Sequence, residues 1–516
     1  MEKQKNLIFG VIVFTLIFCY IPTALQLNFL AGTWATKLTI YPIIIAMVFT
    51  LFYRKSFSLS RDERKMLIRY LVVYFFVMII SLVWGLVDYP YYNVILQGPV
   101  NQIKKLPSVY SFLINHDISV TKQGLLFVWM LARPIKALFV DIFWGLSLSV
   151  LVYVWYKNDF HNGLRFFLKG VIASVIVVVL YGFLDAMYLS GSELATDILI
   201  ILNPIVHEIK EEGIWWPPIL WNGQLRSLFA EPSYYGIFVA FALPWIWYVL
   251  DTSRNMRNRL FLWGILFFLI LFLFLTRART ANVLLLAEVV LLFLFTISGF
   301  LQSRRFFLSV FLCVLLAFGT SLVLFNYGFG KNSNNMTALS YMQDNIGSLT
   351  SVDKRSNRSR YSVMIADLKI GMEHPVLGVG PHLRNAYIPH YLPDKEHLSN
   401  ETKNWIKNQD EKGILRAGFP ELGEYTSRFA ETGILGLLVF MLPSFYLIWR
   451  IIIFLKIHRK DMPQIRAITV YFLISFLGVL ATGIGDSLHV LFSYWLLLGL
   501  GFTLLHYITI ESDEKK

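Results

Sequence analysis

The sequence predicts an all-α, polytopic membrane protein with about 12 transmembrane helices. Hydrophobic residues make up 56% of the 516 residues and charged residues only 15%, whereas soluble domains are close to one quarter charged. The chain also contains many apolar runs that are long enough to cross a bilayer as helices. This composition excludes a water-soluble globule.

The apolar runs define the predicted spans in chain order. They cover residues 7–26, 36–53, 67–87, 137–156, 170–190, 233–250, 260–276, 282–301, 307–326, 431–453, 467–485 and 489–508. The first run follows a basic N-terminus, but it is long and no small-residue cleavage site follows it, so we expect a spanning helix that is retained. Cys19 and Cys313 both fall in apolar runs, which argues against a disulfide framework or a thiolate metal site.

Basic residues in the short loops predict the orientation of these spans. They are Lys3, Lys5, Arg54, Lys55, Arg61, Arg64, Lys65, Lys157, Arg165, Arg254, Arg257, Arg259, Arg304, Arg305, Lys456, Arg459, Lys460 and Arg466. All of them fall on one side of a twelve-span topology if both termini are cytoplasmic, as the positive-inside rule requires. The formal net charge of +13 is therefore first of all an orientation signal.

The opposite, outer side carries the three long segments, 88–136, 191–232 and 327–430. The third is too long for a simple connector, which indicates a functional loop. We therefore divide the chain into a transmembrane body of nine helices (1–326), a large, partly helical outer loop (327–430), and the last three helices with a cytoplasmic tail (431–516).

Arginines on the outer side are the first candidate site residues. Arg277 and Arg279 lie in the short outer turn between the seventh and eighth spans, at a depth where arginine needs an anionic partner. A planar guanidinium binds phosphate oxygens in a bidentate manner, so the turn is a candidate phosphate site. The alternative is a pair of arginines that only reach up to the membrane interface.

A second candidate segment precedes the sixth span. Arg226 opens it, and Glu231 and Pro232 stand where the helix is expected to begin. Glu231 suits the positive end of a helix dipole, and a carboxylate at this depth is also a candidate general base. Both interpretations remain open at this stage.

Further candidates lie in the large outer loop. Arg358 and Arg360 begin an amphipathic helical stretch, whose apolar positions Val363, Ile365, Leu368 and Met372 are expected to lie on the membrane. Gly378 and Gly380 permit a tight turn close to another backbone or to a ligand. His382 follows this turn, and Glu424 precedes the tenth span. No Asp-x-Asp pair stands at the outer end of a span, so we expect no metal-diphosphate site and no cofactor.

Four short segments together resemble the family of O-antigen polymerases and O-antigen ligases. They are the turn Ala278–Ala281, the pair formed by Arg360 and the 375–380 segment fifteen residues further on, the helix start Ala430–Gly436, and the Phe229–Ser233 segment with Arg226 ahead of it. Each is short, but their order along the chain is typical of the family. So is the large outer loop between the last two in chain order, the Arg360 and 375–380 segment and Ala430–Gly436. The resemblance covers residues 222–440 approximately.

The resemblance implies a metal-independent glycosyltransferase that polymerises polyprenyl-diphosphate-linked repeat units at the outer face of a bacterial cytoplasmic membrane. An undecaprenyl-diphosphate-linked glycan would be both donor and acceptor. Other implied partners are membrane lipid, a flippase and a chain-length regulator, with no role for nucleic acid. The implied roles are charge neutralisation by Arg279 and Arg360, proton removal by Glu231 or Glu424, and substrate binding by Arg226, Arg277, Arg358, Gly378, Gly380 and His382.

The sequence departs from the family at one point. Ligases and many polymerases carry a His-Asn pair where this chain has Leu422 and Gly423, so no catalytic histidine is carried over. His382 or His390 would have to fold nearby to replace it. The departure favours a polymerase over a ligase, which remains the first alternative. A lipid-linked glycan transporter is the second, although transporters place charge near the bilayer midplane and here the polar residues gather outside.

Overall fold

The structure is a computed structural model, and it describes residues 1–87, 89–97, 106–209, 217–301, 303–329, 337–345, 355–394, 397–459 and 461–514. Within these ranges the secondary structure is helical apart from one isolated β-bridge between Cys19 and Lys37. The predicted all-α class is therefore confirmed.

Ten helices of the described chain are long and apolar enough to cross a membrane. They are α4 (Arg61–Val87), α7 (Lys122–Tyr156), α8 (Phe160–Leu189), α10 (Pro232–Thr252), α11 (Met256–Leu275), α12 (Arg279–Ile297), α13 (Arg304–Val323), α18 (Glu424–Ile457), α19 (Pro463–Thr482) and α20 (Phe492–Glu514). Each of the ten overlaps one of the predicted spans, and the protein is a multi-pass membrane protein.

The first two predicted spans contain shorter helices, α1 (Glu2–Thr15) and α3 (Ile40–Phe52). The expected span 7–26 is helical only as far as Thr15. Tyr20 has a φ of +60°, which a helix does not accommodate, and Pro22 lacks the backbone N–H that a continuing helix would need. The chain between α1 and α3 instead forms short helical turns.

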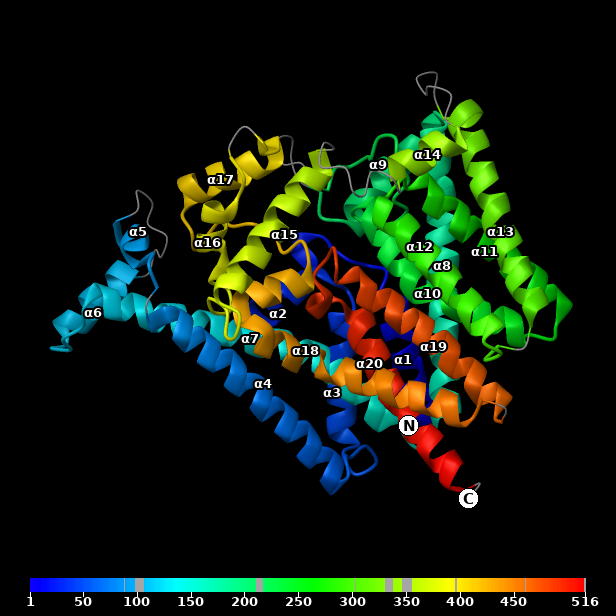
Figure 1. The fold of residues 1–516 in the computed structure, drawn as a ribbon, viewed down its shortest axis with the longest axis horizontal. Helices are drawn as coiled ribbons and strands as arrows, with labels where there is room; N and C mark the ends of the chain where they lie inside the picture. The colour runs from blue at the N-terminus through cyan, green and yellow to red at the C-terminus, as the bar shows by residue number, and fades with distance from the viewer. Residues whose placement is uncertain are drawn as a thin grey trace.

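The spanning helices pack as one body (Figure 1). The closest neighbours are α7 with α20, α1 with α8, α10 with α19, and α11 with α13. Helices α10 and α19 are apolar around their whole circumference and are buried on nearly all sides, which places them inside the bundle.

The three long segments predicted to lie outside are partly helical. They contain α5 (Tyr92–Gln97), α6 (Leu106–Asn115), α9 (Glu193–Val206), α14 (Ala338–Asn345), α15 (Arg355–Glu373), α16 (Arg384–Tyr391) and α17 (Asn400–Lys412). Helices α15 to α17 stand at the top of Figure 1, and both chain termini lie toward the bottom. The two termini therefore share one end of the bundle, and the large loop occupies the other.

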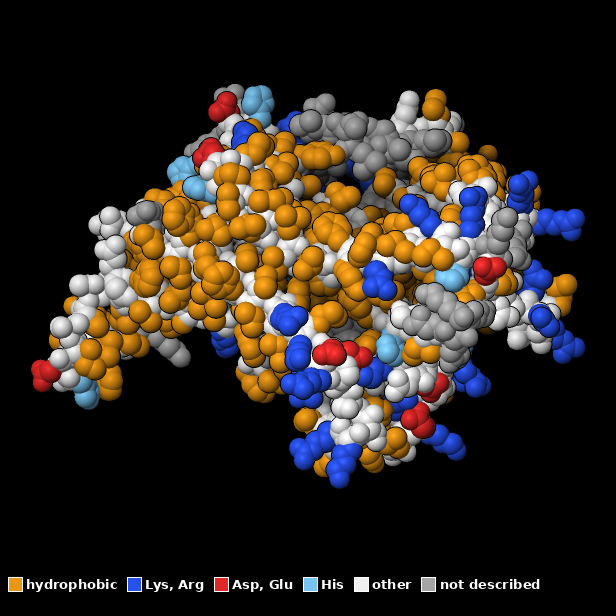
Figure 2. Space-filling model, turned by 60° about the horizontal axis from the view of Figure 1, so that its bottom comes forward, with side chains coloured by type: hydrophobic (Ala, Val, Ile, Leu, Met, Phe, Trp, Pro, Cys, Tyr) orange, Lys and Arg blue, Asp and Glu red, His pale blue; other side chains and the backbone are white. Residues whose placement is uncertain are grey.

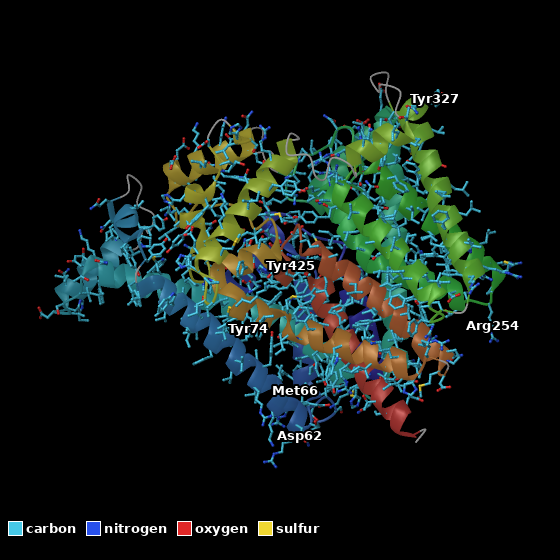
Figure 3. The ribbon with its side chains drawn as sticks, viewed as in Figure 1. Asp62, Met66, Tyr74, Arg254, Tyr327 and Tyr425 are labelled. Atoms are coloured by element: carbon cyan, nitrogen blue, oxygen red, sulfur yellow. The ribbon has the colours of Figure 1, made fainter. Side chains whose placement is uncertain are left out.

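Charge follows the same division. In Figure 2, Lys and Arg side chains gather at the lower centre and along the right side, while hydrophobic side chains cover the left and the middle. Figure 3 places Asp62 at the bottom of the view, Arg254 at the right-hand edge and Tyr327 at the top. This arrangement agrees with the predicted alternation of basic loops. Which end faces the cytoplasm stays a prediction.

Helix α15 is held against the body by a small core and a buried ion pair. Val363, which we expected on the membrane, faces inward, whereas Ile365, Leu368 and Met372 are exposed. Arg384 of α16 donates to both carboxylate oxygens of Asp367 in α15, at 2.8 and 3.0 Å. Ser427 of α18 donates to the same Asp367 carboxylate at 3.1 Å, so the large loop packs onto the start of α18.

Candidate functional site

Two of the segments that resemble the family, 375–380 and 430–436, pack directly on one another. The N–H of Val379 donates to the Ala430 carbonyl at 3.0 Å, and that of Gly380 donates to the Glu431 carbonyl at 2.8 Å. Gly378 has a φ of +66°, and a Cβ there would lie 2.3 Å from the carbonyl carbon of Glu431. Both glycines therefore take part in a close backbone contact, and their expected substrate-binding role stays a prediction.

Arg226 organises the loop ahead of α10. Its side chain is buried, and its guanidinium donates to the carbonyls of Pro218 at 3.0 Å and Ile219 at 2.8 Å. The backbone N–H groups of Arg226 and Ser227 donate to the Asp185 carboxylate at 2.9 and 2.7 Å. These contacts show that Arg226 supports the loop, and its expected role in substrate binding stays a prediction.

The turn that carries Arg279 lies against the start of α10. Arg279 is the first residue of α12, and Glu231 is the N-cap of α10. The two helix starts touch at Gly236 and Ala281, where a Cβ on Gly236 would lie only 2.4 Å from that of Ala281. Glu231 and Arg279, distant in sequence, therefore stand at neighbouring helix ends.

The other two arginines predicted to bind substrate are Arg277 and Arg358, each two residues before Arg279 and Arg360, and their contacts differ. Arg277 has a φ of +50° and its guanidinium lies over the Phe325 ring, 5.5 Å from the centroid. Arg358 is half-buried in the first turn of α15, and its carbonyl accepts a hydrogen bond from Ser362 at 2.6 Å.

Arg360 reaches the turn between α19 and α20. Its Nη1 donates to the Gly485 carbonyl at 2.8 Å. Burial raises the pKa of the next residue, Asp486, to about 6, although the Ser487 N–H and Arg360 act to lower it, and the nearby Glu231 carboxylate adds to the rise. Asp486 therefore lies within electrostatic reach of both predicted groups. We call Arg360, Asp486 and Glu231, with the adjacent Arg279 turn, the arginine–carboxylate cluster.

A second cluster lies at the start of α18. Glu424 is only 1% exposed, and its carboxylate accepts from the Nδ1 and the backbone N–H of His489 at 2.6 and 3.0 Å, while its other oxygen contacts Arg428. Burial alone would lower the pKa of His489, but Glu424 raises it to about 9. We call Glu424, Arg428 and His489 the histidine–carboxylate cluster.

A small, partly open cavity lies beside this second cluster. Its polar wall includes His382, Glu421, Glu431 and Asp141, and its apolar wall includes Tyr74 and Trp495. Figure 3 labels Tyr74 and Tyr425, the latter one residue after Glu424, in the middle of the view below the large loop. The structure thus brings His382 to the same place as Glu424, while His390 stacks on Tyr91.

Sequence reasoning missed Asp486 and His489, which contribute to these two clusters. The only sequence signal is an acidic residue in a short glycine-containing turn, Gly483–Asp486, between the last two spans. Across the described parts of the chain, no group of three or more His, Cys, Asp or Glu side chains has an arrangement that could hold a metal ion.

These features define a multi-pass helical membrane protein with cationic and carboxylate side chains collected at the end that carries its large loop. A family model described as O-antigen ligase matches residues 264–408. The match confirms the predicted resemblance to the O-antigen polymerase and ligase family, over a shorter stretch than expected, and it does not separate polymerases from ligases. It includes Arg279, Arg360 and His382, but not Glu231 or Glu424. A comparison with curated proteins gives no match.

Proposed function

We propose that the protein polymerises polyprenyl-diphosphate-linked oligosaccharide repeat units at the outer face of a bacterial cytoplasmic membrane, for O-antigen, capsule or exopolysaccharide synthesis. The observation that carries the proposal is the arginine–carboxylate cluster: Arg360 contacts the turn of Asp486, and Glu231 lies beside it at the helix end next to Arg279. Such a site combines cations for a diphosphate with carboxylates for a proton.

In the proposed reaction, a sugar hydroxyl of the acceptor attacks the anomeric carbon of the donor. The bond from that carbon to the diphosphate oxygen breaks, and the diphosphate leaves with the electron pair. Arg279 and Arg360 neutralise the charge that develops on it. The carboxylate pair of Glu231 and Asp486 takes the hydroxyl proton. A single displacement of this kind inverts the anomeric configuration.

Glu424, the other base suggested by the sequence, has a different role in this scheme. Both of its oxygens are engaged, one by Arg428 and the other by His489. A carboxylate held in this way is a poor proton acceptor, because ionisation is what its two cationic partners stabilise. Glu424 is better suited to hold His489 in place.

The decisive experiment is to delete the gene in its native host and to separate the glycan-lipids by electrophoresis. A polymerase predicts loss of the ladder, leaving one repeat on the acceptor. Accumulation of long lipid-linked polymer would instead support the alternative, a ligase that transfers glycan to lipid A core or another acceptor. A transporter predicts lipid-linked single repeats that stay on the cytoplasmic side, where an outer-face glycosidase in spheroplasts does not reach them.

The residue-level test replaces Arg279 or Arg360 by Lys. A desolvated charged hydrogen bond is worth roughly 1.5–3 kcal/mol, so each variant should lose on the order of tenfold to a hundredfold in polymerisation rate while accumulating normally. The double variant should lose less than the product of the two losses, since both side chains act on one leaving group. Arg277→Lys is the matched control and should be much milder. Near-normal rates in both single variants would contradict the mechanism.

The proposed orientation places both termini in the cytoplasm and α17 outside. In a background with Cys19→Ser and Cys313→Ser, a Lys407→Cys variant should react with a membrane-impermeant thiol reagent in intact spheroplasts. Lys407 is a suitable position because its side chain is exposed. Arg254→Cys, in the loop between α10 and α11, should react only after lysis. The reverse pattern would overturn the orientation.

A further inference from the structure

We propose that Glu288 is kept as a neutral carboxylic acid inside the membrane, and that its O–H donates to the backbone carbonyl of Ala240 and so positions the helices that carry the proposed reaction. Glu288 lies in the middle of α12, and its side chain is fully buried. Neither of its carboxyl oxygens has a hydrogen-bond partner among the described residues. An ionisable side chain inside a membrane-spanning helix is costly to bury, which makes a role for it the first expectation.

The surroundings of Glu288 favour the uncharged form. Helices α10, α11, α13 and α19 pack against α12, and their charged residues stand in the end turns, away from the middle of α12. They are Asp251, Arg257, Arg259, Arg304, Arg305 and Arg466. The hydroxyls of Tyr235 and Tyr471 donate elsewhere, to the Leu269 carbonyl and the Asp251 carboxylate. Because a buried carboxylate without a counter-ion is too costly to desolvate, the group takes up a proton.

The acceptor for this proton is a carbonyl that a proline deprives of its helical donor. Pro244 lies inside α10 and has no N–H, so the Ala240 carbonyl, four residues earlier, lacks its regular partner. A Cβ placed on Gly478 of α19 would lie 2.4 Å from Oε1 of Glu288 and 3.2 Å from the Ala240 oxygen. The two oxygens are therefore no more than 5.6 Å apart, within reach of a direct hydrogen bond or of one bridging water.

Protonation decides whether these two groups can bond. An ionised carboxylate and a carbonyl are both acceptors, whereas a carboxylic acid also carries a donor. Three helices meet at this point: α12 supplies the acid, α10 the carbonyl, and α19 a glycine whose missing side chain leaves room for the carboxyl group. The acid thus joins helices that have no other polar tie at this position.

The same three helices carry the arginine–carboxylate cluster. Ala240 and Glu288 stand nine residues after Glu231 and Arg279, respectively, which is about 14 Å along each helix at a rise of 1.5 Å per residue. Helix α19 leads into the turn of Asp486. A bond that fixes α10 against α12 at this depth therefore fixes Glu231 relative to Arg279. This positioning role rests on the proposed function, whereas the protonation and the bond do not.

Infrared spectroscopy of the purified full chain in detergent micelles tests the protonation. The difference spectrum between the wild type and Glu288→Gln should show the loss of one C=O stretching band of a protonated carboxyl group, at neutral and at mildly alkaline pH. Glu411→Gln, on the exposed face of α17 with 57% of its side chain accessible, is the matched control and should remove the bands of an ionised carboxylate. Loss of carboxylate bands in Glu288→Gln would overturn the proposal.

Thermal unfolding in micelles tests the bond. Glu288→Leu keeps the bulk but has no donor, so it should lower the apparent melting temperature by roughly 1–3 °C. Glu288→Gln has an amide N–H in place of the O–H and should melt as the wild type does. Pro244→Ala returns an N–H to the Ala240 carbonyl, so in that background Glu288→Leu should cost much less. Equal losses in the two backgrounds would refute the bond to Ala240.

Polymerisation rates separate the positioning role from the proposed function. Glu288→Gln should keep the rate, and Glu288→Leu should lower it on the order of tenfold, because small displacements of positioned groups are costly. A lowered melting temperature with an unchanged rate in Glu288→Leu would refute the positioning role and leave the bond. A wild-type protein that does not polymerise, yet shows the acid band and the coupling to Pro244, would remove the proposed function and leave the neutral acid.

Discussion

Two regions at the end of the bundle that carries the large loop contrast sharply. The segments 374–380 and 430–436 carry the family motifs, and the structure joins them through backbone hydrogen bonds and close glycine contacts. The α19–α20 turn carries no recognisable motif, yet it places Asp486 beside Arg360 and His489 beside Glu424. The comparison teaches that a motif with glycines at close contacts records architecture, whereas the titratable groups can come from a segment that no pattern marks.

The largest expected effect tests the unmarked turn. Asp486→Asn should lower the polymerisation rate by about 10²–10⁴-fold, the usual contribution of a general base, without reducing protein accumulation. In the wild type the rate should rise as the pH passes through about 6, because the base must be ionised, and the variant should lack this rise. Initial rates with lipid-linked repeats in vesicles measure both.

Asp410→Asn, on the exposed face of α17, is the control for a change of charge alone. If Asp486→Asn keeps the wild-type rate and pH profile, the turn is as structural as the motif segments, and the contrast between the two regions disappears.

The second effect tests the motif segments. Gly378→Ala combines a φ of +66° with a Cβ 2.3 Å from the Glu431 backbone, so it should lower the free energy of unfolding by about 3 kcal/mol or more. Gly223→Ala has a similar φ of +73° but nothing within 4 Å, and should cost only about 1–2 kcal/mol. Thermal unfolding in micelles compares the two, and equal losses would mean that the close contact is unimportant.

The third effect concerns the charge of His489. Its folded pKa of about 9 lies above the ordinary value of 6.5, so the protonated ring stabilises the fold fully below pH 6.5. This stability, at most about 3 kcal/mol, is lost as the pH rises through 9. The apparent melting temperature should therefore fall across this interval, and His489→Gln should remove the fall.

Asp486 titrates in a separate window. Its pKa is raised from 3.8 to about 6 in the fold. The stability that Asp486 contributes is therefore lost as the pH rises between these two values, and this loss is complete before His489 begins to lose its proton. A His489→Gln variant that retains the full loss between pH 6.5 and 9 would show that another group causes it.

The smallest effect concerns the contact between the motif segments and α4. Ser81 donates through its hydroxyl to the carbonyls of Leu377 and Glu431. Ser81→Ala should cost about 1 kcal/mol of stability, the usual value of such a bond, with little change in polymerisation rate. A large loss of rate at unchanged stability would assign a direct role in the reaction to the motif segments.

Much of this architecture was predictable because membrane solvation acts on local sequence. Apolar residues in lipid form helices because the backbone must satisfy its own hydrogen bonds. Each of the twelve predicted spans overlaps a helix, and ten helices of the described chain are long enough to cross a membrane. Arg279, Arg360 and Glu231 stood out because charged residues at outer helix ends need partners. The early end of α1 was missed, because Tyr20 and Pro22 act through backbone geometry that hydropathy does not register.

By itself, the sequence determined the helical membrane class, ten of the twelve predicted spans and the arginines worth testing, because each depends on neighbours along the chain. Only the tertiary structure decided that Arg226 is occupied by loop carbonyls, that Gly378 packs on Glu431, and that Asp486 and His489 complete the two clusters. These facts depend on how α18, α19 and α20 pack. When a side chain is buried by segments far apart in the chain, the hydrophobic pattern of its own segment does not indicate that burial.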